Sequence, residues 1–299
     1  MRTKIASLFS IALMFLLCGC LEFEEQSMSY RYDEKTDTLY IFQDYRGITT
    51  DSGGRLSADE VQQLESVLKT QRTFFFANWI LEYNREELLK HRKELKNPPA
   101  DETSKLNEEE RKKYVELLDL ALANVKVENG PFYFDTEKRL CGVQKVTVQK
   151  LSELIRSANS IIPLAVKDSI KDEENVALKA ELVKMLDKRK EFIWLEKNTL
   201  NWVWPMTQAD YDKNFGANGE EKHALEAFKH SGGRIEFNDN EVQFQIGATT
   251  DRVTTLAKPV AKEEKDYKGY KPNVVDEVRK RAVILEKFDV EAARKEFLK

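Results

Sequence analysis

Cysteine is scarce in this chain, and that scarcity excludes a fold held together by disulfides. The 299 residues include three cysteines, of which Cys18 and Cys20 lie close to the amino terminus. Only Cys141 remains in the rest of the sequence, and a single thiol cannot form an internal disulfide. We therefore expect Cys141 to be a small buried residue in a strand, with a reactive thiol as the alternative.

The chain also lacks the excess of basic residues that nucleic-acid binding requires. Its formal net charge is −4, whereas proteins that bind DNA or RNA present basic patches that neutralise phosphates. Removal of the first 19 residues would take away Arg2 and Lys4 and change the net charge from −4 to −6. No nucleic-acid partner is expected.

Complete catalytic motifs are missing as well. The sequence contains no glycine-rich phosphate loop and no Gly-x-Ser-x-Gly nucleophile turn. Ser66 and Lys69 have the spacing of a Ser-x-x-Lys pair, but the companion motifs of penicillin-binding enzymes are absent. His223 and His230 would lie about 10 Å apart along a helix, too far to share one zinc ion. We expect no cofactor, no metal and no identifiable catalytic residue.

One segment matches a calcium-binding loop in part. Oxygen-bearing side chains occupy the first, third, fifth and twelfth positions of an EF-hand pattern: Asp210, Asp212, Asn214 and Glu221. The sixth position, where the loop needs glycine for a sharp turn, is Phe215. An expected strand ending at Pro205 precedes the segment in place of a helix. A polar helix end followed by a turn is the expected structure.

The amino-terminal segment is apolar but too short to span a bilayer. Arg2 and Lys4 precede an apolar run over residues 5–17, and Glu22 soon follows it. A membrane-spanning helix needs about 20 apolar residues, whereas a secretory signal has a basic start and an apolar core of roughly 7–15 residues. The segment therefore predicts an export signal.

The end of this signal, Leu17-Cys18-Gly19-Cys20, resembles the lipobox of bacterial lipoproteins. The resemblance covers only the start of the chain. It implies that Cys20 receives a diacylglycerol on its thiol, becomes the first residue of the mature protein and is often acylated further, for example with palmitate. Several acyl chains give stable anchoring, whereas one gives marginal binding. Cys18 departs from the Ala, Ser or Thr that is commoner at its position.

The residue after the modified cysteine bears on location in the cell envelope. In enteric-type bacteria an Asp at this position resembles a retention signal for the inner membrane, so Leu21 favours the outer membrane. The alternative is that Cys18 and Cys20 are ordinary residues before a soluble-type cut. Small-residue sites that suit such a cut are missing between Gly19 and Ser27.

Three hairpins predict an α+β fold with a largely antiparallel sheet. Apolar residues alternate over residues 28–45, 132–148 and 235–246, and polar turns interrupt each run near Asp33, Asp135 and Asn238. A further short strand over residues 199–204 contains Trp202 and Trp204, which we expect in the core. Helices are expected to cover one face of the sheet.

Capping boxes and apolar periodicity predict the helices. Ser57 with Glu60 opens a helix to about Lys96, and Asn107 with Glu110 opens a second to about Asn124, so the two form a helical hairpin. The first is longer than one core needs, and a break or a projecting end is expected. Further helices are expected over residues 149–160, 174–197 and 274–298, the first two separated by Pro163.

The expected domain plan follows from these segments: signal peptide 1–19, tether 20–27, α+β globular domain 28–248 with helical hairpin 57–125, and polar linker plus C-terminal helix 249–299. The membrane, through the lipid on Cys20, is the expected first partner. The second is an unknown envelope protein or polymer, which the chain would bind or scaffold without catalysis. The alternative is an envelope hydrolase with a carboxylate-based site. No catalytic pair is named for it, because Asp and Glu are too numerous to select one.

Overall fold

Six strands form the main sheet of the computed structural model, which describes residues 21–22, 24–50, 58–73, 83–98, 106–171, 176–196, 199–216, 229, 233–238, 241–247, 254–257 and 271–299. In spatial order the strands are β11 (Thr254–Ala257), β2 (Glu25–Asp33), β3 (Thr38–Arg46), β6 (Leu140–Gln149), β5 (Val125–Phe134) and β12 (Ile284–Leu285). All neighbours are antiparallel except β12 and β5. The α+β prediction is confirmed.

The first predicted hairpin is confirmed as β2 and β3, which pair from Glu25 with Arg46 to Asp33 with Thr38. The carboxylate of Asp33 accepts the N–H of Lys35 at 3.0 Å in the turn. Asp37 closes the turn with a φ of 48°, a left-handed conformation that Asp tolerates.

The second predicted hairpin is confirmed as β5 and β6. The carboxylate of Asp135 accepts the N–H groups of Glu137 at 3.0 Å and Arg139 at 2.9 Å, which is an Asx turn. The register shifts between Asn129 and Phe132. At this bulge a Cβ on Gly130 would lie 2.3 Å from the side chain of Val143, so the close approach requires glycine.

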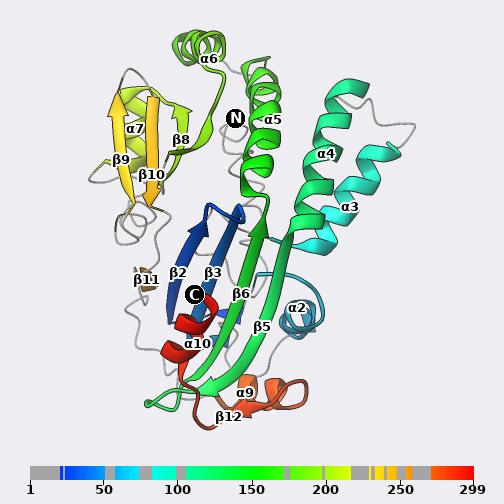
Figure 1. Cartoon of the computed structure of the whole chain (residues 1–299), viewed down its shortest axis with the longest axis vertical. Helices are drawn as coiled ribbons and strands as arrows, with labels where there is room; N and C mark the ends of the chain where they lie inside the picture. Colours follow the sequence, from blue (N-terminus) through cyan, green and yellow to red (C-terminus); the bar gives the residue numbers. More distant parts are fainter. Residues whose placement is uncertain are drawn as a thin grey trace.

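Helices adjoin the neighbouring strands β5 and β6 at the same end of the sheet (Figure 1). α4 (Glu108–Asn124) runs directly into β5, and α5 (Leu151–Lys171) follows β6. The capping box of Asn107 and Glu110 is confirmed at the start of α4. α3 (Arg85–Lys96) lies beside α4, and the guanidinium of Arg85 donates to the carbonyl of Leu122 at 2.6 Å. These contacts confirm the helical hairpin.

The single helix expected from residue 57 to Lys96 is broken. α2 (Ala58–Lys69) ends well before α3, and the N–H of Thr73 donates to the carbonyl of Tyr83 at 2.9 Å between them. Asn84 then caps α3 by accepting the N–H of Glu87. A cap of this kind starts a new helix because it supplies an acceptor for a free N–H group. Ser57 and the run Phe74-Phe75-Phe76 lie outside the described residues.

Two expected helix boundaries are wrong. α5 continues through Pro163 to Lys171: burial of Ile161 and Val166 on its apolar face offsets the roughly 3 kcal/mol that an interior proline costs. α6 (Val176–Lys188) ends before residue 197, and residues 193–196 form the strand β7 (Ile193–Glu196). These residues pair with β8 instead of continuing the helix. The helical spacing of apolar residues in the segment does not reveal this pairing.

A separate four-stranded antiparallel sheet contains the third hairpin. Its order is β7, β8 (Thr199–Pro205), β10 (Glu241–Gly247) and β9 (Arg234–Asn238). The strand over residues 199–204 and the hairpin are confirmed. Trp202 stacks on Phe244 with ring centroids 5.1 Å apart, which confirms its core position. α7 (Gln208–Phe215) follows β8.

The C-terminal region is more structured than expected. β11 pairs with β2 inside the segment expected to be a polar linker. In place of one helix over residues 274–298 there are α9 (Lys271–Arg279), β12 and α10 (Val290–Phe297). Ile284 and Leu285 interrupt the helix because they pair with Phe132 and Tyr133 of β5, and Asp289 starts α10 by accepting the N–H of Ala292 at 2.9 Å.

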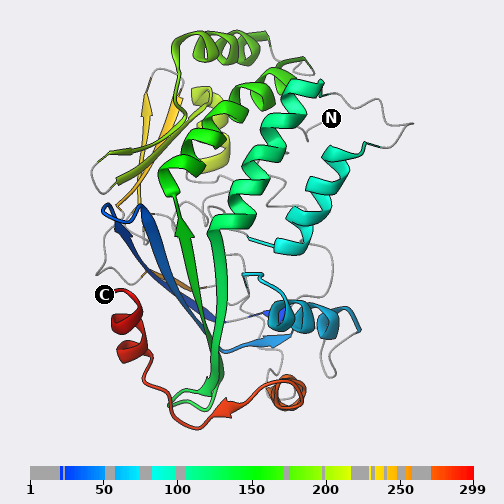
Figure 2. The same ribbon diagram turned by 45° about the vertical axis from the view of Figure 1, so that its right-hand side comes forward.

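Helices cover both faces of the six-stranded sheet, so the expectation of one covered face is wrong (Figure 2). Phe42, Tyr133 and Cys141 pack with Leu298, next to α10. Residues of opposite parity, including Tyr45 and Leu140, pack with α2 and α9. Among the helices that the structure describes, none combines the length and the apolar character needed to cross a bilayer.

Candidate functional site

The chain joins the fold directly after Cys20. Cys20 lies outside the described residues, but β1 (Leu21–Glu22) pairs with β4 (Thr49–Thr50). The N–H of Glu24 then donates to the carbonyl of Arg46 at 2.9 Å, before β2 begins. The described residues of the expected tether, 21–22 and 24–27, are therefore part of the fold, because they pair with neighbouring strands.

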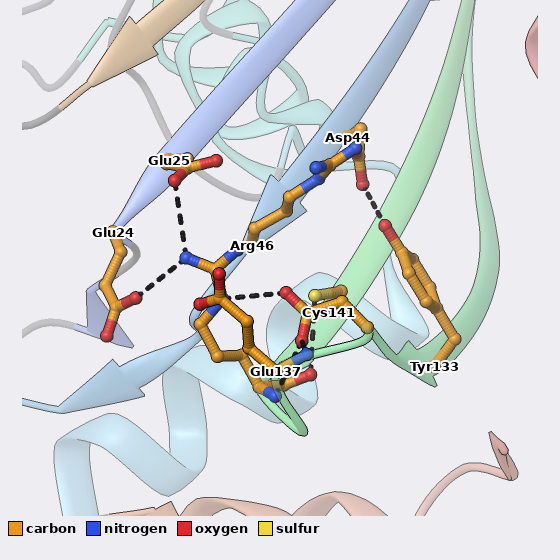
Figure 3. A network of polar contacts seen from close by, with 9 residues as sticks. Glu24, Glu25, Asp44, Arg46, Tyr133, Glu137 and Cys141 are labelled. Atoms are coloured by element: carbon orange, nitrogen blue, oxygen red, sulfur yellow. Dashed lines mark hydrogen bonds and ion pairs between the residues drawn. The ribbon is translucent and has the colours of Figure 1, made fainter. Parts of the chain in front are cut away.

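Four carboxylates surround Arg139 at this end of the sheet, in what we call the Arg139 cluster (Figure 3). Its guanidinium lies 3.2 Å from Glu24, 3.3 Å from Glu25, 2.7 Å from Asp135 and 3.3 Å from Glu137. The Arg139 side chain is only 12% exposed. The cluster joins the segment after Cys20 to the turn between β5 and β6, more than 100 residues away in sequence.

Electrostatics within the cluster favour its charged form. Partial burial alone would raise the pKa of Asp135, but hydrogen bonds from the N–H and guanidinium of Arg139 outweigh it and lower that pKa. The same carboxylates raise the pKa of Arg139, against the effect of its burial. The sequence analysis missed this cluster. Glu24 and Glu25 are ordinary surface residues in the sequence, and nothing local links them to Arg139.

A second charged group, Asp44, is buried next to the cluster and is 2% exposed. Its carboxylate accepts the hydroxyl of Tyr133 at 2.5 Å and Nε of Arg46 at 2.8 Å (Figure 3). Burial raises the pKa of Asp44 although both donors lower it. Burial, followed by the charge of Asp44, raises the pKa of Tyr133. The carboxylate of Asp44 thus has two hydrogen-bond donors, Tyr133 and Arg46.

Cys141 is the buried strand residue that the sequence predicts. It lies in β6 with no exposed surface, and its Sγ donates to the carbonyl of Arg139 at 3.4 Å. Burial raises the pKa of the thiol to about 12, so the neutral form dominates near pH 7. Because thiolate is the nucleophilic form, this environment suits packing and opposes a reactive thiol.

Uncharged polar residues occupy the opposite face of the sheet. The hydroxyl of Tyr45 donates to Gln43 at 2.6 Å, and the amide of Gln144 donates to Asn129 at 2.6 Å. Gln144 also reaches the carbonyl of Arg72, and Asn129 reaches that of Val67 at the end of α2. These bonds fasten α2 and the segment after it to the sheet.

The calcium-loop pattern does not form a loop. Asp210, Asp212 and Asn214 lie within α7, where the calcium-binding pattern requires a loop. The carboxylate of Asp212 accepts the amide of Gln208 at 2.9 Å, and Glu221 lies outside the described residues. The described part of the chain also contains no group of three His, Cys, Asp or Glu side chains placed to hold a metal. His223 and His230 lie outside it.

Comparison of the chain with models of known protein families, with curated protein sequences and with solved structures finds no match.

Proposed function

We propose that this protein is a bacterial envelope lipoprotein, anchored by acyl chains on Cys20, which binds or scaffolds another envelope component. The observation that carries the proposal is the sequence Leu17-Cys18-Gly19-Cys20 after a basic and apolar leader. The position of β1 supports it: Leu21, next to the residue that would become the mature amino terminus, is paired with Thr50.

The buried ionisable groups support a binding role over catalysis. The carboxylate of Asp44 accepts hydrogen bonds from Tyr133 and from Arg46, whose own side chain is 37% exposed. The ring of Phe288 lies 5.3 Å from that of Tyr133, so an apolar side chain packs against the tyrosine. A buried carboxylate whose hydrogen bonds are satisfied in this way stabilises a fold.

The helical hairpin is the surface that we assign to a partner. α3 contains no buried residue, and eight of its twelve residues are Arg, Lys, Asp or Glu. Its charged side chains are of both signs, as on a solvated face that pairs with a polar or charged partner. The proposed partner is an envelope protein or polymer, and the acidic net charge of the chain argues against nucleic acid.

Replacement of Cys20 tests the anchor. Cys20→Ala should abolish metabolic labelling with a palmitate analogue and release the protein from membranes. Cys18→Ala is the matched control, since it removes the neighbouring thiol and should retain both labelling and membrane attachment. Labelling that persists in Cys20→Ala would show that the proposed modification is wrong. In a diderm host, the labelled protein should fractionate with the outer membrane.

A photo-crosslinking residue tests the binding surface. Placed at Lys90 on α3, whose side chain is 74% exposed, it should give a discrete adduct in intact envelopes. The same residue at the exposed Lys188 of α6 is the control. Equal patterns of adducts at both positions would contradict a specific surface on the hairpin.

A further inference from the structure

The six-stranded sheet has two chemically different ends. At one end, which we call the anchor end, Glu25, Arg46 and Cys141 lie side by side in register, next to the turn at Asp135. At the other, the helix end, Gln149 pairs with Thr38 and Val125 pairs with Val148. α4 and α5 extend from the helix end. Each end is thus defined by backbone pairing.

We infer that the anchored protein stands on the bilayer, with the anchor end of the sheet against the lipid surface and the α3–α4 pair held away from it. The inference rests on the proposed acylation of Cys20 and adds an orientation to it. The partner of the anchor end is the phospholipid surface in which the acyl chains are embedded.

The connection between lipid and fold is too short to let the body turn over freely. Consecutive Cα atoms are about 3.8 Å apart, so Cys20 lies within that distance of Leu21 and at most about 14 Å from Glu24. Leu21 is already paired with Thr50, and Glu24 is held by Arg139. The chain is therefore held to the fold at Leu21 and at Glu24, one and four residues after the proposed site of acylation.

The length of the paired elements sets the height of the helices above the membrane. β6 has ten residues, which span about 30 Å at roughly 3.3 Å per residue. α4 has seventeen residues and adds about 25 Å. In both ribbon views α4 and α5 extend beyond β5 and β6 along the long direction of the molecule. The tip of the hairpin is then at most about 55 Å from the anchor end.

Charge does not favour lipid binding at the anchor end. Four carboxylates surround Arg139, so this arginine is neutralised within the fold and does not itself attract anionic headgroups. The acyl chains must hold the protein, and the short connection must orient it. Membrane attachment should accordingly be insensitive to salt, which screens charge pairs but not the burial of acyl chains.

Fluorophores at three exposed positions test the orientation. Three variants each add one exposed cysteine for the label, while Cys141 stays buried. Thr136→Cys in the β5–β6 turn, Lys126→Cys at the start of β5 and Glu109→Cys in the first turn of α4 place the label at increasing height. The acylated protein would be incorporated into phosphatidylcholine vesicles containing a headgroup nitroxide quencher. Quenching should be strongest at residue 136, weaker at 126 and absent at 109.

Two results would separate the failure of this inference from the failure of the anchor. If the protein floats with vesicles but residue 109 is quenched as strongly as residue 136, the body lies flat and the orientation is wrong. If Cys20→Ala floats as well as the unmodified sequence, the proposed anchor is wrong whatever the quenching pattern. Loss of flotation in high salt would also overturn the inference, since it would require a charged contact with lipid.

Discussion

Asp44 lies in β3 and Asp135 in the β5–β6 turn. Their environments shift the pKa values of the two carboxyl groups in opposite directions. Burial raises the pKa of Asp44 above its ordinary value of 3.8, whereas hydrogen bonds from Arg139 overcome burial and lower that of Asp135. A raised pKa in the folded state means that protonation favours folding, and a lowered pKa means the reverse. The two residues therefore contribute opposite slopes to stability against pH.

Asp44→Asn tests this difference. The contribution of Asp44 is present below its unfolded pKa and is lost as pH rises through its raised folded pKa. The unfolding free energy of the unmodified protein minus that of Asp44→Asn should therefore fall between pH 3 and pH 7. Denaturant titrations at several pH values measure this difference, and a rise over the same range would contradict the burial argument.

Asp135→Asn is the matched control with the opposite sign. Its contribution is present above the unfolded pKa of 3.8 and is lost as pH falls through the lowered folded pKa. The unfolding free energy of the unmodified protein minus that of Asp135→Asn should therefore rise as the pH rises from the lowered folded pKa to the unfolded pKa. Parallel slopes for the two substitutions would show that the titration of other groups dominates.

At the scale of elements, local signals predict what local interactions determine. Asn107 caps α4 by accepting the N–H of Glu110 at 3.0 Å, and the carboxylate of Glu110 accepts the N–H of Asn107 at 2.9 Å. Both groups lie within four residues, so the sequence pattern suffices. The three hairpins are predictable for the same reason, since each turn is encoded by the Asx residue within it.

Replacement of Asn107 should weaken the helical hairpin. Asn107→Ala removes the acceptor for the first turn and is expected to cost about 1 kcal/mol of unfolding free energy. Hydrogen exchange should accelerate at the first-turn amides of α4, while amides in β3 change only with global stability. Asn107→Ser, which retains a capping oxygen, should remain close to the unmodified protein. An Ala variant indistinguishable from the Ser variant would rule out the cap as a source of stability.

The elements that the sequence did not predict depend on distant partners. β7 forms where an apolar run with helical spacing meets β8, and β12 forms where Ile284 meets Phe132. Helix α5 passes through Pro163 because its buried face outweighs the lost hydrogen bond. In each case a tertiary contact overrides a local conformational preference. Local sequence patterns do not identify the distant partner, so they do not predict these elements.

For the whole molecule, the same limit applies to the candidate site. Cys20 is evident from four adjacent residues, whereas the Arg139 cluster joins Glu24 to a turn 115 residues further along the chain. Gly47 adds a steric condition, because a Cβ there would lie 2.6 Å from the side chain of Glu24 and its φ is +66°. One structural unit thus contains the amino-terminal segment, the end of β3 and the β5–β6 turn. These three parts are far apart in the sequence.

Arg139→Gln tests whether this unit joins the amino-terminal segment to the body. The substitution removes the cation among four carboxylates and should cost about 3 kcal/mol at pH 7. Most of this cost comes from Asp135, because the side chains of Arg139 and Asp135 are only 12% and 11% exposed, whereas that of Glu137 is 69% exposed. The cost should shrink below about pH 4, where carboxylates protonate. Thermal unfolding at both pH values measures this, with the exposed neighbour Lys138→Gln as the control expected to change stability by less than about 0.5 kcal/mol.

Hydrogen exchange shows where the Arg139→Gln substitution acts. If the cluster holds the segment after Cys20 on the sheet, the amides of β1 and Glu24 should exchange faster while those of β8, in the other sheet, do not. A uniform increase across both sheets would mean that Arg139 supports global stability alone. Selective release of β1 would instead make the cluster the structural link between the proposed membrane anchor and the folded body, and in the proposed orientation would allow the tilt of the sheet to vary.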